Sequence, residues 1–420
     1  MKNTSEIIID LFKKGNLQQA EKKIKELAAS NDYEEILLTA EEAMELGFFD
    51  HSIPLYEALL EGYPNEGELI ITLAELYMEQ DREEEALQLL SQVKQDDEMF
   101  ASALLLEADL YQMQGLSEVA EQKLAKAKLT LPNEPIVDFA LAELYYQEGR
   151  FGRAIDSYKK VRESHVELAG VNIDQRLAES YSNSGQFEEA LPYYELAIAD
   201  KTELNTLFEY GFTAYQAGYP TKAIQLLTEL KNMDHEYHSL YVPLASAYEQ
   251  LEELEQALET MEQGIKVDEF NKELFFKAGK LALKLQKTEK GIEFFRQAIA
   301  LDPGYLEASL TLIKIFQHEE RYDEVVETIE SIRKYGEDDP QFDWMLASAY
   351  QHQEQYSLSL KHYEEAYNFF KTNPEFLEDF GYFLLEEGKF NEAEEIFNKL
   401  LELDPTNEEF IQVVERLGEN

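Results

Sequence analysis

The chain has 420 residues, and its 86 acidic residues against 37 lysines and arginines give a formal net charge of −49. So large a negative charge opposes binding to phosphate backbones, because such binding depends on neutralising phosphates with lysine and arginine, and we expect no nucleic-acid partner. Disorder is also excluded, since 44% of the residues are hydrophobic and 25 tyrosines and 24 phenylalanines can bury a large core.

The chain contains no cysteine, which excludes disulfides, thiol nucleophiles and cysteine-based metal sites and fits a reducing compartment. At the amino terminus the apolar run of Ile7, Ile8 and Ile9 is too short for a signal peptide. No uncharged stretch of about 18 residues that could span a membrane follows. We expect a cytoplasmic protein with no membrane insertion.

An internal repeat runs along nearly the whole chain. A small residue, which we number position 8 of the repeat, recurs every 34 residues, apart from one interval of 36 and one of 33. The series is Ala40, Ala74, Ala108, Ala142, Ala178, Gly211, Ala245, Gly279, Ile313, Ala347 and Gly381. Tyrosine, alanine and proline recur at fixed distances from it, as in Tyr77, Ala86 and Pro132. Ile313 is the bulky exception, so the repeat of about residues 306–339 is the least typical.

In its length and in these residues the repeat resembles that of the tetratricopeptide repeat (TPR) family, whose 34-residue unit is a helix, a turn and a helix. The chain as a whole resembles the YpiA-like cytoplasmic multi-TPR proteins of low-GC Gram-positive bacteria. The resemblance implies an all-α, right-handed superhelical solenoid that acts as a non-enzymatic scaffold or adaptor.

In chain order we expect about twelve TPR repeats and a capping helix. Residues 1–168 would hold repeats one to five, residues 169–407 repeats six to twelve, and residues 408–420 the solvating cap. The interval of 36 residues would place a bend near residues 164–170 within one continuous solenoid. The apolar face of the cap would comprise Phe410, Val413, Val414 and Leu417.

Glycine marks the turn inside most repeats, where the first helix ends. A helix that ends in the left-handed conformation favours glycine, which adopts it without a steric penalty. The glycines at this place are Gly15, Gly47, Gly115, Gly149, Gly185, Gly218 and Gly388.

The resemblance also implies where a partner would bind, because in this family the first helix of each repeat lines a concave groove. Repeats two to four would give it an acidic face with apolar contacts, made of Leu37, Glu41, Met44, Glu45, Ile71, Glu75, Met78, Glu79, Leu105, Asp109 and Met113. Repeats five to seven would give it an aromatic zone, made of Phe139, Glu143, Tyr146, Gln175, Glu179, Asn183, Phe208, Phe212 and Tyr215. Repeats nine to eleven would give it a basic strip, made of Phe276, Lys280, Lys284, Lys314, His318, Trp344 and His352.

We hypothesise that this groove binds a partner protein or an extended peptide, with aromatic anchors and opposed charge zones that set its direction. Residues 51–100 carry 13 acidic and 2 basic residues, and residues 251–300 carry 10 and 8, so the acidic end favours a partner with a basic segment. The competing interpretation is that acidic side chains only keep the solenoid soluble, and that part of the aromatic set belongs to the core between repeats.

No glycine-rich phosphate loop, nucleophile elbow or zinc-protease motif is present, so we predict no enzyme, no cofactor and no metal. Two alternatives stay open. One is an adaptor that delivers client proteins to an ATP-dependent protease or an assembly machine. The other is a metal-binding or enzymatic activity hidden in the repeats, for which His318 and His352 are the candidates because they occupy the same position in consecutive repeats.

Overall fold

The computed structural model describes residues 3–168 and 170–418. Within these residues the chain forms α-helices, one short 3-10 helix and no strand, which confirms the predicted all-α architecture. Its contacts divide it into two compact units, Met1–Ala217 (unit 1) and Gly218–Asn420 (unit 2). The predicted boundary after residue 168 and the predicted bend stay predictions, since residue 169 lies outside the described residues.

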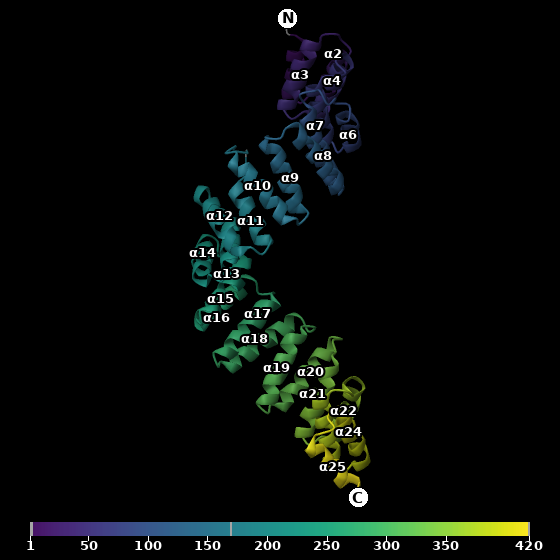
Figure 1. The fold of residues 1–420 in the computed structure, drawn as a ribbon, viewed down its shortest axis with the longest axis vertical. Coiled ribbons are helices and arrows are strands. Elements are labelled where there is room, and N and C mark those ends of the chain that lie inside the picture. The colour runs from purple at the N-terminus through teal and green to yellow at the C-terminus, as the bar shows by residue number, and fades with distance from the viewer. Residues whose placement is uncertain (1–2, 169, 419–420) are drawn as a thin grey trace. The chain divides into compact units, whose positions relative to one another are not determined.

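Unit 1 is a row of antiparallel helices, drawn in purple to teal in Figure 1. Its helices are α1 (Thr4–Lys13), α2 (Leu17–Ala28), α3 (Tyr33–Glu45), α4 (Phe49–Gly62), α5 (Gly67–Met78), α6 (Glu83–Leu90), α7 (Phe100–Met113), α8 (Ser117–Thr130), α9 (Pro135–Gln147), α10 (Phe151–Glu163), α11 (Ile173–Asn183), α12 (Phe187–Asp200) and α13 (Leu204–Gln216). Odd numbers are the first helices of the repeats and even numbers the second helices.

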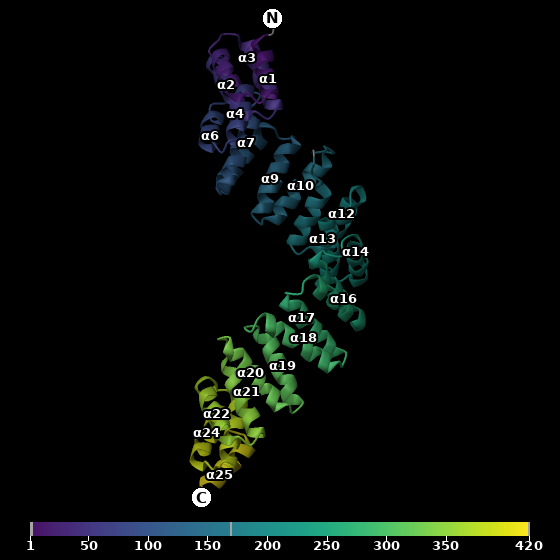
Figure 2. The ribbon, with the colours of Figure 1, turned by 180° about the vertical axis from the view of Figure 1, so that it is seen from behind.

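Unit 2 continues the same alternation, as Figure 2 shows from behind in green and yellow. Its helices are α14 (Pro220–Met233), η1 (His238–Leu240), α15 (Tyr241–Gln250), α16 (Leu254–Val267), α17 (Lys272–Lys284), α18 (Thr288–Leu301), α19 (Leu306–His318), α20 (Tyr322–Lys334), α21 (Pro340–His352), α22 (Tyr356–Phe370), α23 (Pro374–Glu386), α24 (Phe390–Leu403) and α25 (Glu408–Gly418). Phe410 and Val413 of α25 are buried against the preceding helices.

Position 8 of the repeat is small because the two helices of a repeat touch there. A Cβ added to Gly279 of α17 would lie 2.7 Å from a ring carbon of Phe295 in α18, which is too close. Ala142 in α9 and Ala178 in α11 are fully buried at the same position. The small residue thus lets an aromatic ring of the second helix fill the space beside the first.

The turn inside the repeat is left-handed even where the sequence has no glycine. Gly149 has a φ of 69° there, and the residues at the same position in other repeats keep a similar backbone. These residues are Asp81, Glu252, Gln286, Glu320 and Glu354, with φ between 55° and 61°. The tertiary packing of the repeat therefore holds the turn at a cost that glycine would avoid.

In unit 1 the first helices lie next to one another, since α1 contacts α3, α5 contacts α7, α7 contacts α9 and α11 contacts α13. Side chains that follow position 8 in successive repeats therefore come together on one face. This arrangement positions the site described next.

Candidate functional site

Two neighbouring hollows open in unit 1 between the first helices of repeats two and three. The first, of about 510 Å³, lies where α3 and α5 meet the second helix α4. The second, of about 530 Å³, lies farther along α3 and α5 and reaches α7. Thr72 of α5 lines both hollows, so they adjoin, and we call them together the acidic groove.

Glutamates supply the charge of the acidic groove. The first hollow is lined by Glu34, Glu41, Glu66 and Glu68, and the second by Glu45, Glu75 and Glu79. Among the described residues no lysine, arginine or histidine lines either hollow, and none of the seven carboxylates has an ion pair or a side-chain hydrogen bond there. Their negative charge is therefore available to a group from outside the chain.

Aromatic rings form one wall of the first hollow. A Cβ added to Gly62 would lie 2.6 Å from Cζ of Tyr33, so the glycine at the end of α4 lets the Tyr33 ring lie against the backbone. The Tyr33 ring in turn meets Tyr63 nearly edge-on, with 5.2 Å between centroids. The two rings give this wall an aromatic surface on which an apolar side chain of a partner can pack.

Tyr56 of α4 lies at the base of the first hollow. Its side chain is 3% exposed, and its hydroxyl has no hydrogen-bond partner among the described residues. Burial raises the pKa of Tyr56 to about 12, and the charges of Glu41 and Glu68 add to the rise. The phenol is therefore a neutral donor that faces two carboxylates.

Apolar side chains form the walls of the second hollow: Met44, Phe49, Leu76, Met78 and Leu106. Burial raises the pKa of the Glu75 carboxyl above its ordinary value. Methionine-rich walls adapt to different apolar side chains, so this hollow can accept an aliphatic or aromatic group beside a cation.

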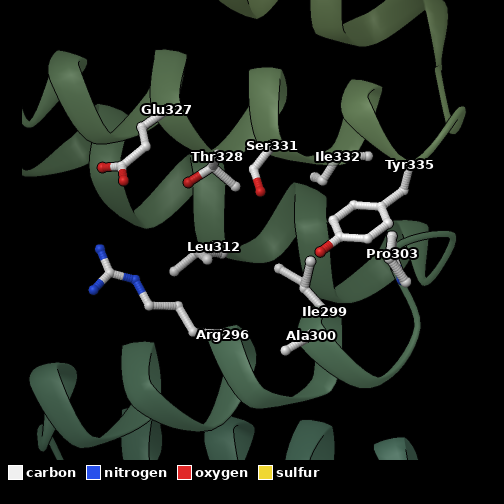
Figure 3. Close-up of a pocket in the computed structure, with 10 residues that line it drawn as sticks. All are labelled: Arg296, Ile299, Ala300, Pro303, Leu312, Glu327, Thr328, Ser331, Ile332 and Tyr335. Carbon is white, nitrogen blue, oxygen red and sulfur yellow. The ribbon is translucent and has the colours of Figure 1, made fainter.

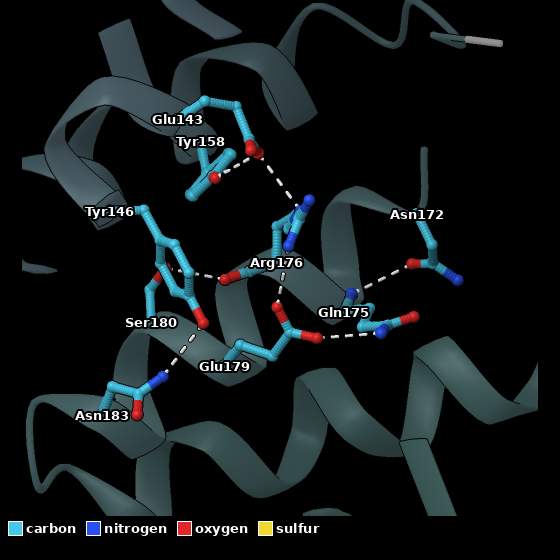
Figure 4. A network of polar contacts seen from close by, with 9 residues as sticks. All are labelled: Glu143, Tyr146, Tyr158, Asn172, Gln175, Arg176, Glu179, Ser180 and Asn183. Atoms are coloured by element: carbon cyan, nitrogen blue, oxygen red, sulfur yellow. Dashed lines mark hydrogen bonds and ion pairs between the residues drawn. The ribbon is translucent and has the colours of Figure 1, made fainter. Parts of the chain in front are cut away.

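The predicted residues Glu143 and Tyr146 belong to a different arrangement, which we call the Arg176 network (Figure 4). The guanidinium of Arg176 in α11 lies 3.1 Å from Glu143 of α9 and 3.2 Å from Glu179 of its own helix. Tyr158, fully buried in α10, donates a hydrogen bond of 2.5 Å to Glu143. Here the acidic side chains are neutralised inside the protein.

The electrostatics of the Arg176 network agree with this geometry. Burial by itself would lower the pKa of Arg176, but the charges of Glu143 and Glu179 outweigh it and raise the pKa. The Arg176 guanidinium lies over the Tyr146 ring, 5.8 Å from its centroid. The Tyr146 hydroxyl accepts a hydrogen bond of 3.1 Å from the Asn183 side chain.

The other predicted aromatic residues are half-buried and take part in packing. Phe208 and Phe212 stack on α13 with 6.1 Å between centroids, and Tyr215 lies on the same helix. Phe139 packs against Tyr158 at 6.3 Å. These rings contact one another or the core, in line with the competing interpretation of the aromatic set.

The lysines and histidines of the predicted basic strip in unit 2 are exposed, but carboxylates of the same unit contact two of the lysines. Lys284 pairs with Glu249 at 2.6 Å, and Lys280 lies 3.9 Å from Glu307. His352 stacks on Tyr322 at 4.3 Å. Lys314 and His318 are exposed on α19.

Two members of the predicted strip need correction. Phe276 is 5% exposed and packs against Phe295 and Tyr305, so it belongs to the core and not to an open surface. Trp344 is half-buried, with its indole N–H donating to Asp379 at 2.9 Å and its ring edge-on to that of Phe376. Asp109, from the acidic set, is exposed on α7 but does not line the acidic groove.

A smaller hollow of about 310 Å³ lies in unit 2 among α18, α19 and α20 (Figure 3). Arg296 and Glu327 face each other from opposite walls at one end, and Tyr335 stands at the other. The hollow adjoins the atypical repeat that contains Ile313. Because this hollow is lined by an arginine and a glutamate, it does not favour a ligand of one charge, whereas the acidic groove favours a cation.

Sequence reasoning missed part of the acidic groove. It placed Leu37, Glu41, Met44 and Glu45 of α3, Glu75 and Met78 of α5 and Glu79 just after α5 on one face, and the structure brings these seven residues together. Ile71, predicted with them, lines neither hollow. It missed residues from α4, the α4–α5 connection, α7 and the remaining turns of α3 and α5. Those are Tyr33, Glu34, Phe49, Tyr56, Leu59, Tyr63, Glu66, Glu68, Leu69, Thr72, Leu76 and Leu106. The tyrosine that recurs sixteen residues after position 8, as Tyr56, Tyr158 and Tyr194, was the available signal.

In the part of the chain that the structure describes, no helix is long and apolar enough to cross a bilayer. No three histidine, aspartate or glutamate side chains in residues 3–168 and 170–418 gather so as to hold a metal ion.

Comparisons with solved structures return tetratricopeptide proteins at low similarity. YrrB, described as a TPR protein with an unusual peptide-binding site, has a TM-score of 0.38 and 18% identity over 44% of this chain and 95% of its own. The C-terminal part of a TPR repeat-containing protein from Cytophaga hutchinsonii has a TM-score of 0.42 and 17% identity, over 66% of this chain and 99% of its own.

Sequence comparison is more decisive. Models of YpiA-like tetratricopeptide repeats match residues 112–166 and, for the C-terminal repeats, 340–407. General tetratricopeptide models match residues 43–110, 175–206, 242–305 and 282–349. The Protein CTR9 homolog of Arabidopsis thaliana is 23% identical over 61% of this chain but only 24% of its own length. The TPR repeat-containing protein YpiA of Bacillus subtilis is 45% identical over 384 residues, which cover 91% of each chain. Together with the helix–turn–helix repeats, this match shows that the chain belongs to the YpiA-like family of tetratricopeptide repeat proteins.

Proposed function

We propose that the protein is a non-enzymatic interaction scaffold that binds a segment of a partner protein in the acidic groove of unit 1. The observation that carries the proposal is the pair of adjoining hollows whose seven carboxylates lack a cation among the described residues. Tetratricopeptide proteins generally mediate protein–protein interactions, and YrrB is described as having a peptide-binding site.

The chemistry of the acidic groove favours a partner segment that is both basic and apolar. Lysine or arginine would neutralise the carboxylates, and the Tyr33 and Met44 walls would bury large apolar side chains. Such binding should weaken as salt rises towards about 1 M, where the Debye length is about 3 Å. We keep the cytoplasm as the proposed location, since a chain without cysteine needs no oxidising compartment.

The test is a pulldown from source-cell lysate with the full chain and two charge-reversed variants. Glu41→Lys with Glu75→Lys reverses the acidic groove, whereas Glu84→Lys with Glu118→Lys makes the same charge change on exposed residues of the second helices α6 and α8. We expect the groove variant to lose the partners that the wild type and the control variant retain. Identical partner sets for all three proteins would contradict the proposal.

An adaptor for a protease or an assembly machine would use the same groove, so a second measurement separates it from a scaffold. Protein half-lives in a deletion strain, complemented with the wild type or the groove variant, should stay unchanged for a scaffold. Clients that become long-lived only without a working groove would favour the adaptor.

A further inference from the structure

Repeats two and three carry the same carboxylate pair as repeats five and six. Glu143 and Glu179 directly follow position 8 in repeats five and six, and Glu41 and Glu75 directly follow it in repeats two and three. In the first pair the Arg176 guanidinium lies within 3.1–3.2 Å of both carboxylates. The second pair has no cation among the described residues.

The residue that differs is two places before position 8 in the second repeat of each pair. Repeat six has Arg176 there, and repeat three has Thr72. Thr72 lines both hollows, so the place that corresponds to the Arg176 side chain lies where the hollows meet.

The tyrosine of this arrangement is also repeated. Tyr158, sixteen residues after position 8 of repeat five, donates to Glu143. Tyr56 is its counterpart in repeat two, 3% exposed at the base of the first hollow, with a hydroxyl that has no hydrogen-bond partner among the described residues. The Tyr56 side chain is buried while its hydroxyl lies in the hollow that Glu41 and Glu68 also line, so the polar network that is complete around Tyr158 lacks its cation here and can be completed by a ligand or by water.

We propose that the acidic groove binds an arginine side chain of the partner between Glu41 and Glu75, as the protein binds its own Arg176 between Glu143 and Glu179. This inference rests on the proposed function and specifies the group that is recognised. Arginine fits better than lysine because its planar guanidinium donates to two carboxylates at once, whereas the lysine ammonium is a compact charge with a tightly held water shell.

The two hollows also specify what flanks the arginine. Leu69 in the first hollow and Leu76 in the second are seven helical residues apart, which is about 10 Å. In an extended segment, residues i, i+2 and i+4 face one side, and i and i+4 are about 13 Å apart. An extended segment with a large apolar side chain two places before and two places after the arginine is long enough to reach both hollows, and we use this arrangement for the test peptides.

The test uses the full chain and three fluorescein-labelled peptides that differ only at the central residue. The first is Leu-Ala-Arg-Ala-Leu with blocked ends, the second has lysine at the centre, and the third has neutral citrulline, which keeps the shape of arginine. We expect the arginine peptide to bind about fivefold to tenfold tighter than the lysine peptide by fluorescence anisotropy, and the citrulline peptide to bind weakest.

A graft into the protein provides the matched test. Thr72→Arg should place the protein's own guanidinium between Glu41 and Glu75 and weaken the arginine peptide at least about tenfold. Thr130→Arg adds the same charge on an exposed residue at the end of α8, outside the acidic groove, and should change affinity by less than about threefold. Circular dichroism and the thermal midpoint of each variant verify that it folds.

Equal affinity for the arginine and lysine peptides overturns the inference, as does equal binding by the Thr72→Arg and Thr130→Arg variants. Absence of arginine-peptide binding at about 1 mM, where even a weak complex is detected, overturns it as well. If these results appear while the pulldown still depends on Glu41 and Glu75, the guanidinium site fails and the proposed function stands. If the pulldown is independent of both glutamates, the proposed function itself fails.

Discussion

The acidic groove and the Arg176 network place glutamates at the same repeat position and use them differently. In the Arg176 network a guanidinium and a buried tyrosine hold Glu143, so its charge contributes to the packing of α9, α10 and α11. In the acidic groove Glu41 and Glu75 have no such partner among the described residues. A repeat position therefore fixes where a charge lies, and the neighbouring repeat decides whether the charge is used for stability or left for a ligand.

Removal of the arginine should give the largest effect. We expect Arg176→Thr to lower the free energy of unfolding of unit 1 by about 2 kcal/mol, because two half-buried carboxylates lose their cation. The value is below that for a fully buried pair because the Arg176 side chain is 36% exposed.

Urea unfolding followed by far-UV circular dichroism, with hydrogen exchange across α9–α11, measures the Arg176→Thr loss. Trp344, the one tryptophan of the sequence, lies in unit 2. Its fluorescence follows the unfolding of unit 2, which serves as the internal control. Adding Glu143→Gln should restore part of the loss, since the two residues interact. A loss below about 0.5 kcal/mol would place the Arg176 pairs among ordinary surface ion pairs.

The two tyrosines form a matched pair for the next effect. Tyr158→Phe should cost about 1.5 kcal/mol, because it removes a buried hydrogen bond to a charged group. Tyr56→Phe should change stability by less than about 0.5 kcal/mol, because its hydroxyl has no partner among the described residues. Thermal unfolding of both variants measures the difference, and equal losses would remove the contrast between the two regions.

The left-handed turns allow the same comparison at the backbone. Gly149→Ala, beside the Arg176 network, should cost about 1 kcal/mol, since alanine acquires a steric penalty at a φ of 69°. Asp81, at the same position beside the acidic groove, has a φ of 55°. Asp81→Gly removes the steric penalty there but adds the conformational entropy of glycine to the unfolded chain, so we expect the free energy of unfolding to rise by about 0.5 kcal/mol. Urea midpoints test both signs, and a destabilising Asp81→Gly would show that the aspartate side chain stabilises its turn.

The smallest effect concerns the free carboxylate of Glu75, whose pKa burial raises. The unfolded chain then releases this proton more readily than the folded chain, so the stability gained from protonation is present below about pH 4.5 and is lost as pH rises through the folded pKa. Glu75→Gln should therefore be more stable than the wild type by up to about 0.5 kcal/mol at pH 7, an amount reduced for partial solvent exposure.

Thermal unfolding of Glu75→Gln from pH 4 to pH 8 tests this expectation. The advantage over the wild type should shrink towards zero at the acidic end. Glu143→Gln is the control at the same repeat position, and it should be less stable than the wild type at pH 7 because Glu143 is paired with Arg176. An advantage that does not depend on pH would assign the Glu75 effect to packing instead of charge.

The sequence alone was enough to predict the all-α repeat, its 34-residue period and the family. The period places small residues such as Ala142 and Gly279 at helix contacts and repeats the left-handed turn at Gly149, because each feature recurs at a fixed place in the repeat. It also placed Glu41 and Glu75 on one face, because residues at equal repeat positions lie on equal faces of stacked helices.

The tertiary structure alone decided which of these side chains are engaged. Periodicity cannot show that Phe276 turns into the core, that Gly62 lets Tyr33 wall a hollow, or that Arg176 reaches a glutamate of the preceding repeat. Those outcomes depend on side chains from different helices that meet in space, so a single residue such as Thr72 or Arg176 changes the state of its neighbours without altering the repeat.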